Sequence, residues 1–179
     1  MAADSSRAAS SNNGPREAAL RWFDELSGPL RRYLVVTGAL PPQADDAVQE
    51  TFLRLYQQLC KHGEISNVRA WTFKVANNYI RDQRRNAYTR RTISLGEATQ
   101  TVERFADSSA GAERAILSEE REQRLHKAIE RLPARERECI VLRSSGLKYR
   151  QIAEVMEISL ATVSNLAAKA TERLAEDLL

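Results

Sequence analysis

The sequence contains little of what disulfide-bonded, zinc-binding or turn-rich proteins need. Its 179 residues include only 2 cysteines, 7 glycines and 5 prolines. Cys60 and Cys139 stand far apart and lack the spacing of metal ligands, so neither a disulfide framework nor a zinc site is supported. This use of cysteine fits a protein of the reducing cytosol best. The low glycine and proline content argues against a turn-rich all-β fold. We therefore expect a cytoplasmic protein without bound metal.

Long apolar segments are also missing. No apolar run approaches the roughly 18 residues that a membrane-spanning helix needs, so we expect no membrane insertion. Residues 1–15 are rich in Ala, Ser and Asn and have no apolar core, which excludes a secretory signal and predicts a disordered leader.

Residue patterns for catalysis are not found. His62 and His126 are the only histidines, and they are far apart in the chain. The sequence has no Gly-Lys-Ser/Thr phosphate loop, metal-spaced cluster or nucleophile motif. We expect no catalytic residue and no cofactor, which counts against an enzyme acting on nucleic acid or nucleotides.

The charges are nearly balanced in number but are unevenly distributed. The net charge is +3. Residues 69–91 contain seven basic residues and one acid, whereas residues 92–120 contain six acids and two basic residues. A basic block followed by an acidic connector predicts a face that binds a polyanion and a tether that avoids that face.

The apolar spacing predicts an all-α protein, with two small helical domains joined by a flexible linker. The apolar positions 44, 48, 52, 55 and 59 recur at helical intervals. Gly28 and Pro29 should loosen an earlier helix over Glu17–Val36. The expected domain limits are 16–91, an acidic linker over 92–111, and 112–179. Further helices are expected over residues 67–88, from about residue 112 to Pro133, and over 134–144, 148–156 and 160–178.

Tyr149 to Ala168 fits a helix-turn-helix, the C-terminal motif in which the second helix enters a DNA major groove. Ser159 is a suitable N-cap for that second helix. Glu157 stands in the turn where Gly is usual, so a left-handed residue there would be strained. A three-helix bundle that only resembles the motif is the alternative for this segment.

The exposed start of the second helix has an unusual composition for DNA reading. Asn165 could pair with adenine, and Ala or Thr could touch a thymine methyl. No arginine, however, is placed to donate two hydrogen bonds to a guanine. We therefore expect weak, salt-sensitive DNA binding of low specificity by this domain alone. The candidate base-reading residues are Leu160, Ala161, Thr162, Ser164, Asn165 and Lys169, and the candidate phosphate contacts are Arg143, Lys148 and Arg150.

A second candidate DNA surface lies on the third helix. Its residues are spaced three, four, three and four, so they share one side of a helix, opposite Phe73, Ala76 and Ile80. We call them the basic stripe: Trp71, Lys74, Asn78, Arg81 and Arg85. Cations neutralise phosphates and an aromatic ring can stack on an unpaired base, which favours single-stranded or unwinding nucleic acid. A core position for Trp71 and a merely solvated arginine face are the alternatives.

Three stretches resemble the bacterial sigma-70 family, specifically its small extracytoplasmic-function (ECF) RNA polymerase sigma factors. Asp45-Asp46-Ala-Val-Gln-Glu-Thr-Phe52 resembles the helix that docks on the clamp helices of the polymerase β′ subunit. Ala70-Trp71, Ala76-Asn77-Asn78 and Asp82-Gln-Arg-Arg85 together resemble the helix that melts and reads the downstream (−10) promoter element, with Asn77 where the family usually has Arg. Leu132-Pro133 through Leu174 resembles the domain that binds the upstream (−35) element and the β-subunit flap tip.

The resemblance implies a sigma factor that binds core RNA polymerase and recognises and melts promoter DNA. It implies a polymerase-binding set of Asp45, Asp46, Gln49, Glu50 and Phe52, and it adds Asn77 and Arg84 to the DNA-binding residues of the third helix. The acidic linker would thread through polymerase or act as a plain tether. Because no domain follows Leu179, we expect regulation by a separate anti-sigma factor. The alternative is a stand-alone helix-turn-helix regulator that binds operator DNA as a dimer.

Overall fold

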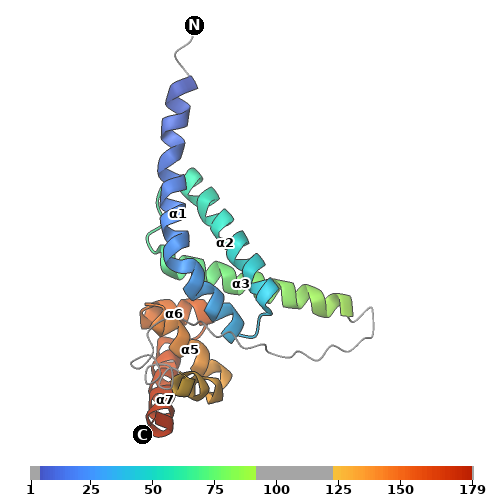
Figure 1. The fold of residues 1–179 in the computed structure, drawn as a ribbon, viewed down its shortest axis with the longest axis vertical. Coiled ribbons are helices and arrows are strands. Elements are labelled where there is room, and N and C mark those ends of the chain that lie inside the picture. Colours follow the sequence, from blue (N-terminus) through green and yellow to red (C-terminus); the bar gives the residue numbers. More distant parts are fainter. Residues whose placement is uncertain (1–4, 92–122, 179) are drawn as a thin grey trace, which may run out of the picture. The chain divides into compact units, whose positions relative to one another are not determined.

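The chain folds into α-helices throughout the residues that the structure describes (Figure 1). The structure, a computed structural model, describes residues 5–91 and 123–178, with side chains over 14–87 and 123–178. Residues 123–131 form a helical segment that Figure 1 leaves unlabelled. The all-α prediction is confirmed, and the predicted linker over 92–111 lies outside the described residues. The labelled helices are α1 (Ser5–Val36), α2 (Pro41–His62), α3 (Val68–Arg91), α5 (Ala134–Ser144), α6 (Tyr149–Met156) and α7 (Leu160–Leu178).

Contacts within the chain divide these helices into two compact units. The first unit contains α1, α2 and α3, and the second contains α5, α7 and most of α6. No helix in the described part of the chain is both long and apolar enough to cross a membrane.

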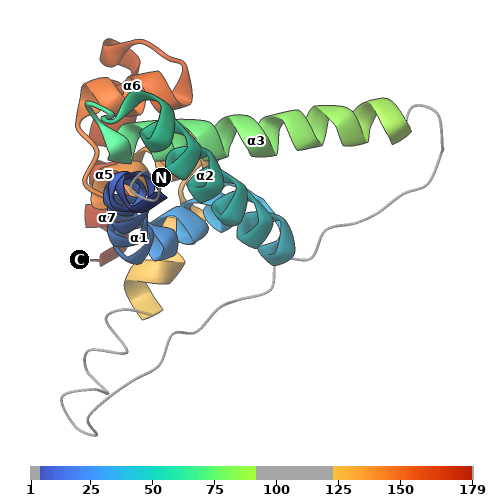
Figure 2. The ribbon, with the colours of Figure 1, turned by 90° about the horizontal axis from the view of Figure 1, so that it is seen from above.

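In the first unit α1 and α2 lie side by side and α3 crosses them (Figures 1 and 2). The five α2 positions picked out by apolar spacing are all buried: Ala44, Val48, Phe52, Leu55 and Leu59. Tyr33 and Phe73, both fully buried, meet edge to face with ring centroids 5.4 Å apart. Burial of large apolar side chains supplies most of the stabilisation of such a core, at about 25 cal/mol for each Å² removed from water.

The first helix departs from the sequence expectation in two ways. It begins at Ser5, so it starts before Glu17 and includes residues that we expected in a disordered leader. It also continues through Pro29, where the sequence predicts loosening. Proline removes one helical hydrogen bond, but Leu26 and Leu30 on either side are fully buried, so packing holds the helix across this point.

The ends of α2 and α3 are set by local capping. Gly63 ends α2 with φ +75°, a left-handed conformation that a residue with a Cβ adopts only with strain. Asn67 caps the start of α3, because its side-chain Oδ1 accepts a hydrogen bond from the Ala70 N–H at 3.1 Å. These caps fix where the basic stripe starts along α3.

The second unit has its own buried core. Leu142, Leu147, Ile152 and Val163 are fully buried, and they come from α5, the α5–α6 turn, α6 and α7 respectively. The bounds of α5 and α7 match the predicted ranges, and α6 starts one residue later because Lys148 is its N-cap. The turn between α6 and α7 contains Glu157 with φ 55°, so this non-glycine residue does adopt the left-handed conformation that would be strained there.

Candidate functional site

The basic stripe lies on the exposed side of α3. Phe73, Ala76 and Ile80 are buried on the opposite side, as the spacing predicts. Trp71 and Asn78 are half-buried, whereas Lys74, Arg81 and Arg85 are exposed. The helix therefore brings an accessible ring, an amide and three cations to one surface, which is the composition that holds an unstacked strand.

The cations of the stripe are positioned by their own helix. Arg81 Nη2 donates to Asn78 Oδ1 at 2.9 Å, and Arg85 lies 3.7 Å from the Asp82 carboxylate. The Arg85 side chain is 78% exposed, so this ion pair is solvent-screened and contributes little to stability. Exposed pairs of this kind constrain the side chains only weakly.

Arg84 occupies a different environment from the stripe. Its Nη2 donates to the Thr37 carbonyl at 3.0 Å, directly after the end of α1. That carbonyl is one of those left without a partner where a helix stops, so the guanidinium acts as a side-chain cap. Gly38 follows with φ +90°, a backbone conformation that favours glycine, and a Cβ there would lie 3.4 Å from the guanidinium, an ordinary contact distance. Arg84 is thus engaged in joining α3 to α1.

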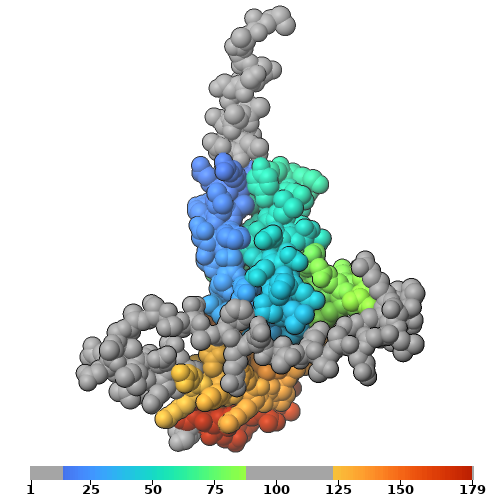
Figure 3. Space-filling model, turned by 45° about the vertical axis from the view of Figure 1, so that its right-hand side comes forward, coloured from blue at the N-terminus to red at the C-terminus, as the bar shows by residue number. Residues whose placement is uncertain are grey.

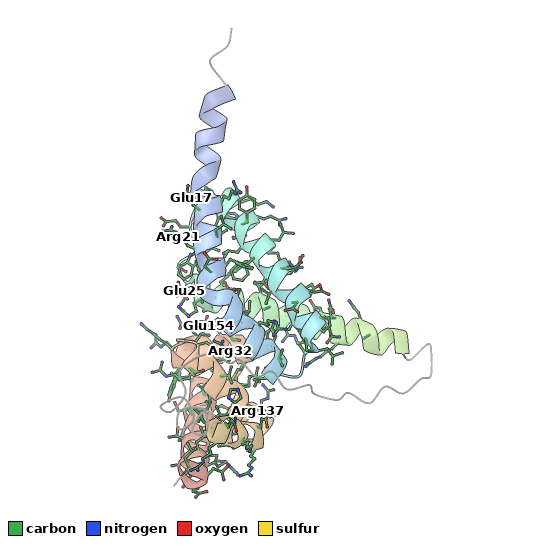
Figure 4. All side chains as sticks on the ribbon, viewed as in Figure 1. Glu17, Arg21, Glu25, Arg32, Arg137 and Glu154 are labelled. Atoms are coloured by element: carbon green, nitrogen blue, oxygen red, sulfur yellow. The ribbon has the colours of Figure 1, made fainter. Side chains whose placement is uncertain are left out.

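Two further residues of the basic block also lie off the stripe. Arg69 forms an ion pair with Glu25, the last of three charged residues that follow one side of α1 with Glu17 and Arg21 (Figure 4). Asn77 is half-buried, next to the stripe residue Asn78. Part of the positive charge counted along the sequence therefore serves contacts between helices.

A second surface is formed by α2, which is open to solvent on one side (Figure 3). Asp46, Gln49 and Glu50 line a shallow hollow together with Leu53 and Tyr79. Leu53 is 52% exposed, a large apolar side chain surrounded by polar ones. Glu50 accepts a hydrogen bond from Arg54 at 2.7 Å, and the Arg54 guanidinium lies 5.8 Å from the centre of the Tyr79 ring. We call these five hollow-lining residues the docking face.

The other two residues of the predicted polymerase-binding set sit differently. Phe52 is buried and packs edge-on against Phe23 at 5.0 Å, so it fastens α2 to α1 beneath the surface. Asp45 is partly exposed and accepts a 2.5 Å hydrogen bond from Arg31 Nε, which raises the pKa of Arg31. Its charge is therefore partly neutralised from within the fold.

In the second unit, α6, the turn and α7 form the helix-turn-helix that the sequence predicts. The Thr162 N–H donates to Ser159 Oγ at 3.1 Å, which confirms Ser159 as the cap of α7. The predicted base-reading residues are exposed on α7: Leu160, Ala161, Thr162, Ser164, Asn165 and Lys169. The three predicted phosphate contacts are also exposed, around the start of α6. Of these, Arg143 donates to the Leu147 carbonyl at 3.1 Å and lies 5.6 Å from the Tyr149 ring centre.

Family models match both units. Residues 22–90 match "Sigma-70 region 2" and residues 122–174 match "Sigma-70, region 4". The chain is 32% identical over 156 residues to the ECF RNA polymerase sigma factor SigL of Mycobacterium tuberculosis, covering 83% of each chain. This chain belongs to the ECF group of the sigma-70 family.

Further comparisons agree with this membership. The sigma factor is 30% identical over 161 residues to the ECF RNA polymerase sigma-E factor of Escherichia coli, covering 87% of this chain and 81% of that protein. Its fold is similar to that of the sigma factor RpoE from Bartonella quintana, solved in complex with the anti-sigma factor NepR. That match has a TM-score of 0.65 at 23% identity, and it covers 88% of this chain and 94% of the other. A stand-alone operator-binding regulator is accordingly not favoured.

The structure adds two residues of the sigma factor that the sequence analysis did not select. Leu53 and Tyr79 complete the hollow with Asp46, Gln49 and Glu50. Leu53 falls outside the 44, 48, 52, 55, 59 spacing, but this signal is weak, because Ala47 and Thr51 also fall outside it and are buried. Tyr79 carried no such signal, since its place beside α2 depends on how α3 crosses. Among the described residues, no group of three His, Cys, Asp or Glu side chains could hold a metal ion.

Proposed function

We propose that this sigma factor binds the β′ clamp helices of core RNA polymerase through its docking face and opens the −10 element with its basic stripe. The second unit binds the −35 element and the β flap. The observation that carries this proposal is α3, which buries Phe73, Ala76 and Ile80 and leaves a ring, an amide and three cations accessible on one side. The protein acts by binding alone, in the cytoplasm, with no catalytic residue of its own.

The energetics favour strand capture on the polymerase over capture by the free chain. Separating DNA strands costs about 1.4 kcal/mol for each base-pair step on average. Stacking of an unpaired base on an aromatic ring returns about 1–3 kcal/mol. One accessible ring, Trp71, therefore offsets one or two steps, so the remaining cost must be met by contacts with polymerase.

The docking face has the composition of a protein interface. Its acidic groups favour a basic partner surface and guide the approach of that partner. The exposed Leu53 and the half-buried Tyr79 give an apolar centre that can be desolvated. Asp45 and Phe52 support the surface through their contacts with α1.

Reconstitution with core polymerase tests the proposal. Run-off transcription from a promoter library should give initiation that depends on this chain. No initiation on any promoter, with a control sigma factor active in the same reaction, would overturn it. Asp46→Lys and Glu50→Lys should weaken the binding of core polymerase, whereas Asp24→Lys, an exposed charge reversal on α1, should not.

Strand opening is tested separately from docking. Trp71→Ala and Arg85→Ala should reduce the permanganate reactivity of unpaired thymines in the promoter complex, with core binding retained. Lys61→Ala, which removes an exposed cation at the end of α2, is the matched control. Normal opening by the Trp71 and Arg85 variants would make the stripe structural only.

Regulation is proposed from the relatives. Bartonella quintana RpoE was solved in complex with an anti-sigma factor. We expect a separate anti-sigma factor to hold this chain inactive as well, by covering the surfaces that polymerase or promoter would use. Competition between that partner and core polymerase in a pull-down would support this, and simultaneous binding of both would contradict it.

A further inference from the structure

The first half of α7 is free of charge. Residues 160–168 contain no Asp, Glu, Lys or Arg, and the first cation is Lys169. The next cation, Arg173, lies 3.2 Å from the Glu136 carboxylate of α5, and that carboxylate is almost completely buried. Arg173 Nε is therefore directed at α5, and Arg173 lies eight residues beyond Asn165 along α7.

The hydroxyl groups at this end of α7 are occupied within the helix. The Ser159 and Thr162 hydroxyls bond to each other at 2.7 Å. Ser164 Oγ donates to the Leu160 carbonyl at 3.2 Å. Each of these hydroxyls thus already makes a hydrogen bond within the helix or its cap and keeps only part of its hydrogen-bonding capacity for a base.

Asn165 is the exception on this surface. It is exposed, and its amide makes no hydrogen bond within the described part of the chain. The carboxamide carries one acceptor and a two-hydrogen donor side by side, which matches the N6 and N7 atoms of adenine in the major groove. Guanine presents two acceptors, O6 and N7, at the same edge, so a carboxamide cannot pair with both.

One neighbour of Asn165 favours the same base pair. Ala161, four residues before Asn165 and therefore on the same side of α7, is exposed. Lys169, four residues after Asn165, is exposed as well. Apolar side chains in the major groove contact the C5-methyl group of thymine. The free amide and the methyl group of Ala161 therefore both favour an A·T pair at the position that Asn165 reaches.

We infer that Asn165 is a specificity-determining residue of the second unit, through which this sigma factor reads one adenine of its upstream element. The inference rests on the proposed function, because it requires that α7 contacts promoter DNA. Arg143, Lys148 and Arg150 contribute phosphate contacts that carry no sequence information. Sequence choice at that position is then made by a single amide.

Selection on a randomised upstream element tests the inference. The full chain, bound to core polymerase, transcribes a library with a fixed downstream element, and the templates that initiate are sequenced. The wild type should enrich adenine at one upstream position, by roughly 5- to 150-fold over the other bases. Asn165→Ala should remove the preference at that position alone. Asn165→Arg supplies two donors and should shift the preferred base to guanine.

Thr171→Ala is the matched control, because it shortens a polar side chain on α7 whose hydroxyl bonds to the Ala167 carbonyl at 2.8 Å. The control should keep the adenine preference. Guanine enrichment by the wild type, or an unchanged profile in Asn165→Ala, would overturn the inference and leave the proposed function standing. An equal loss in Thr171→Ala would also overturn it. No initiation from any template would instead refute the proposed function.

Discussion

Glu157 is a non-glycine residue in the left-handed conformation, and its replacement by glycine should stabilise the second unit. Its φ and ψ are 55° and 46°, at the end of α6. This conformation costs an L-residue with a Cβ about 1–2 kcal/mol. Glycine avoids that cost but loses about 0.4–1 kcal/mol through the greater freedom of the unfolded chain. We therefore expect Glu157→Gly to raise the free energy of unfolding by about 1 kcal/mol, or roughly 4–8 °C in Tm for a domain of this size.

Exposure of Cys139 gives a probe of unfolding in the second unit. This thiol is fully buried, whereas Cys60 is exposed, so labelling in a Cys60→Ser background reports when the second unit opens. The urea midpoint for labelling should rise in Glu157→Gly. Glu157→Gln removes the charge but keeps the Cβ, so it should give no such rise. A midpoint that falls in Glu157→Gly, or an equal rise in Glu157→Gln, would refute the strain explanation.

Three further predictions concern buried or capping groups. The hydroxyl of the buried Thr51 has no hydrogen-bond partner among the described residues, so Thr51→Val should stabilise the first unit by about 1 kcal/mol. Thr72→Val loses the 2.6 Å hydrogen bond from the Thr72 hydroxyl to the Val68 carbonyl and should destabilise the unit. Both changes are measured by urea unfolding with tryptophan fluorescence. In the same assay Arg84→Gln should cost about 0.5–1.5 kcal/mol through the lost cap on α1, and an equal loss in the exposed Arg85→Gln would contradict this. Burial raises the pKa of the Cys139 thiol above its ordinary value of 9.0, and the Glu138 carboxylate adds a smaller effect. The unfolded chain therefore loses this proton at lower pH than the folded protein, so the free energy of unfolding should fall as pH rises above about 9. Cys139→Ala should remove this contribution to the pH dependence of stability.

Regular spacing explains why much of the first unit could be predicted. The burial of α2 at positions 44, 48, 52, 55 and 59 follows from a helical period that any apolar core would select. The basic stripe is likewise a property of one helix, because residues three and four apart share a side whatever lies next to them. Ser159 and Glu157 were predictable for the same local reason: a cap and a turn involve only nearby residues.

The exposed end of α1 shows where spacing misleads. Leu20 and Phe23 fit the apolar period of the helix but are 52% and 41% exposed. Phe23 meets Phe52 of α2 there, whereas α3 crosses α1 nearer Tyr33. A period identifies the side of a helix that prefers burial, but the neighbouring helices decide how much of its length is covered.

The sequence by itself determined which residues share a helix side, where the helices stop and which family the chain resembles, because all of these depend on residues close together along the chain. Only the tertiary structure decided which of those side chains are free to act. Arg84 is drawn to the end of α1, Asp45 to Arg31, and Arg173 to Glu136, while Leu53 and Tyr79 meet in one hollow. These pairings join residues that are distant in sequence. Whether a charged or aromatic side chain is paired within the protein or exposed to a partner depends on which groups packing brings within a few ångströms of it.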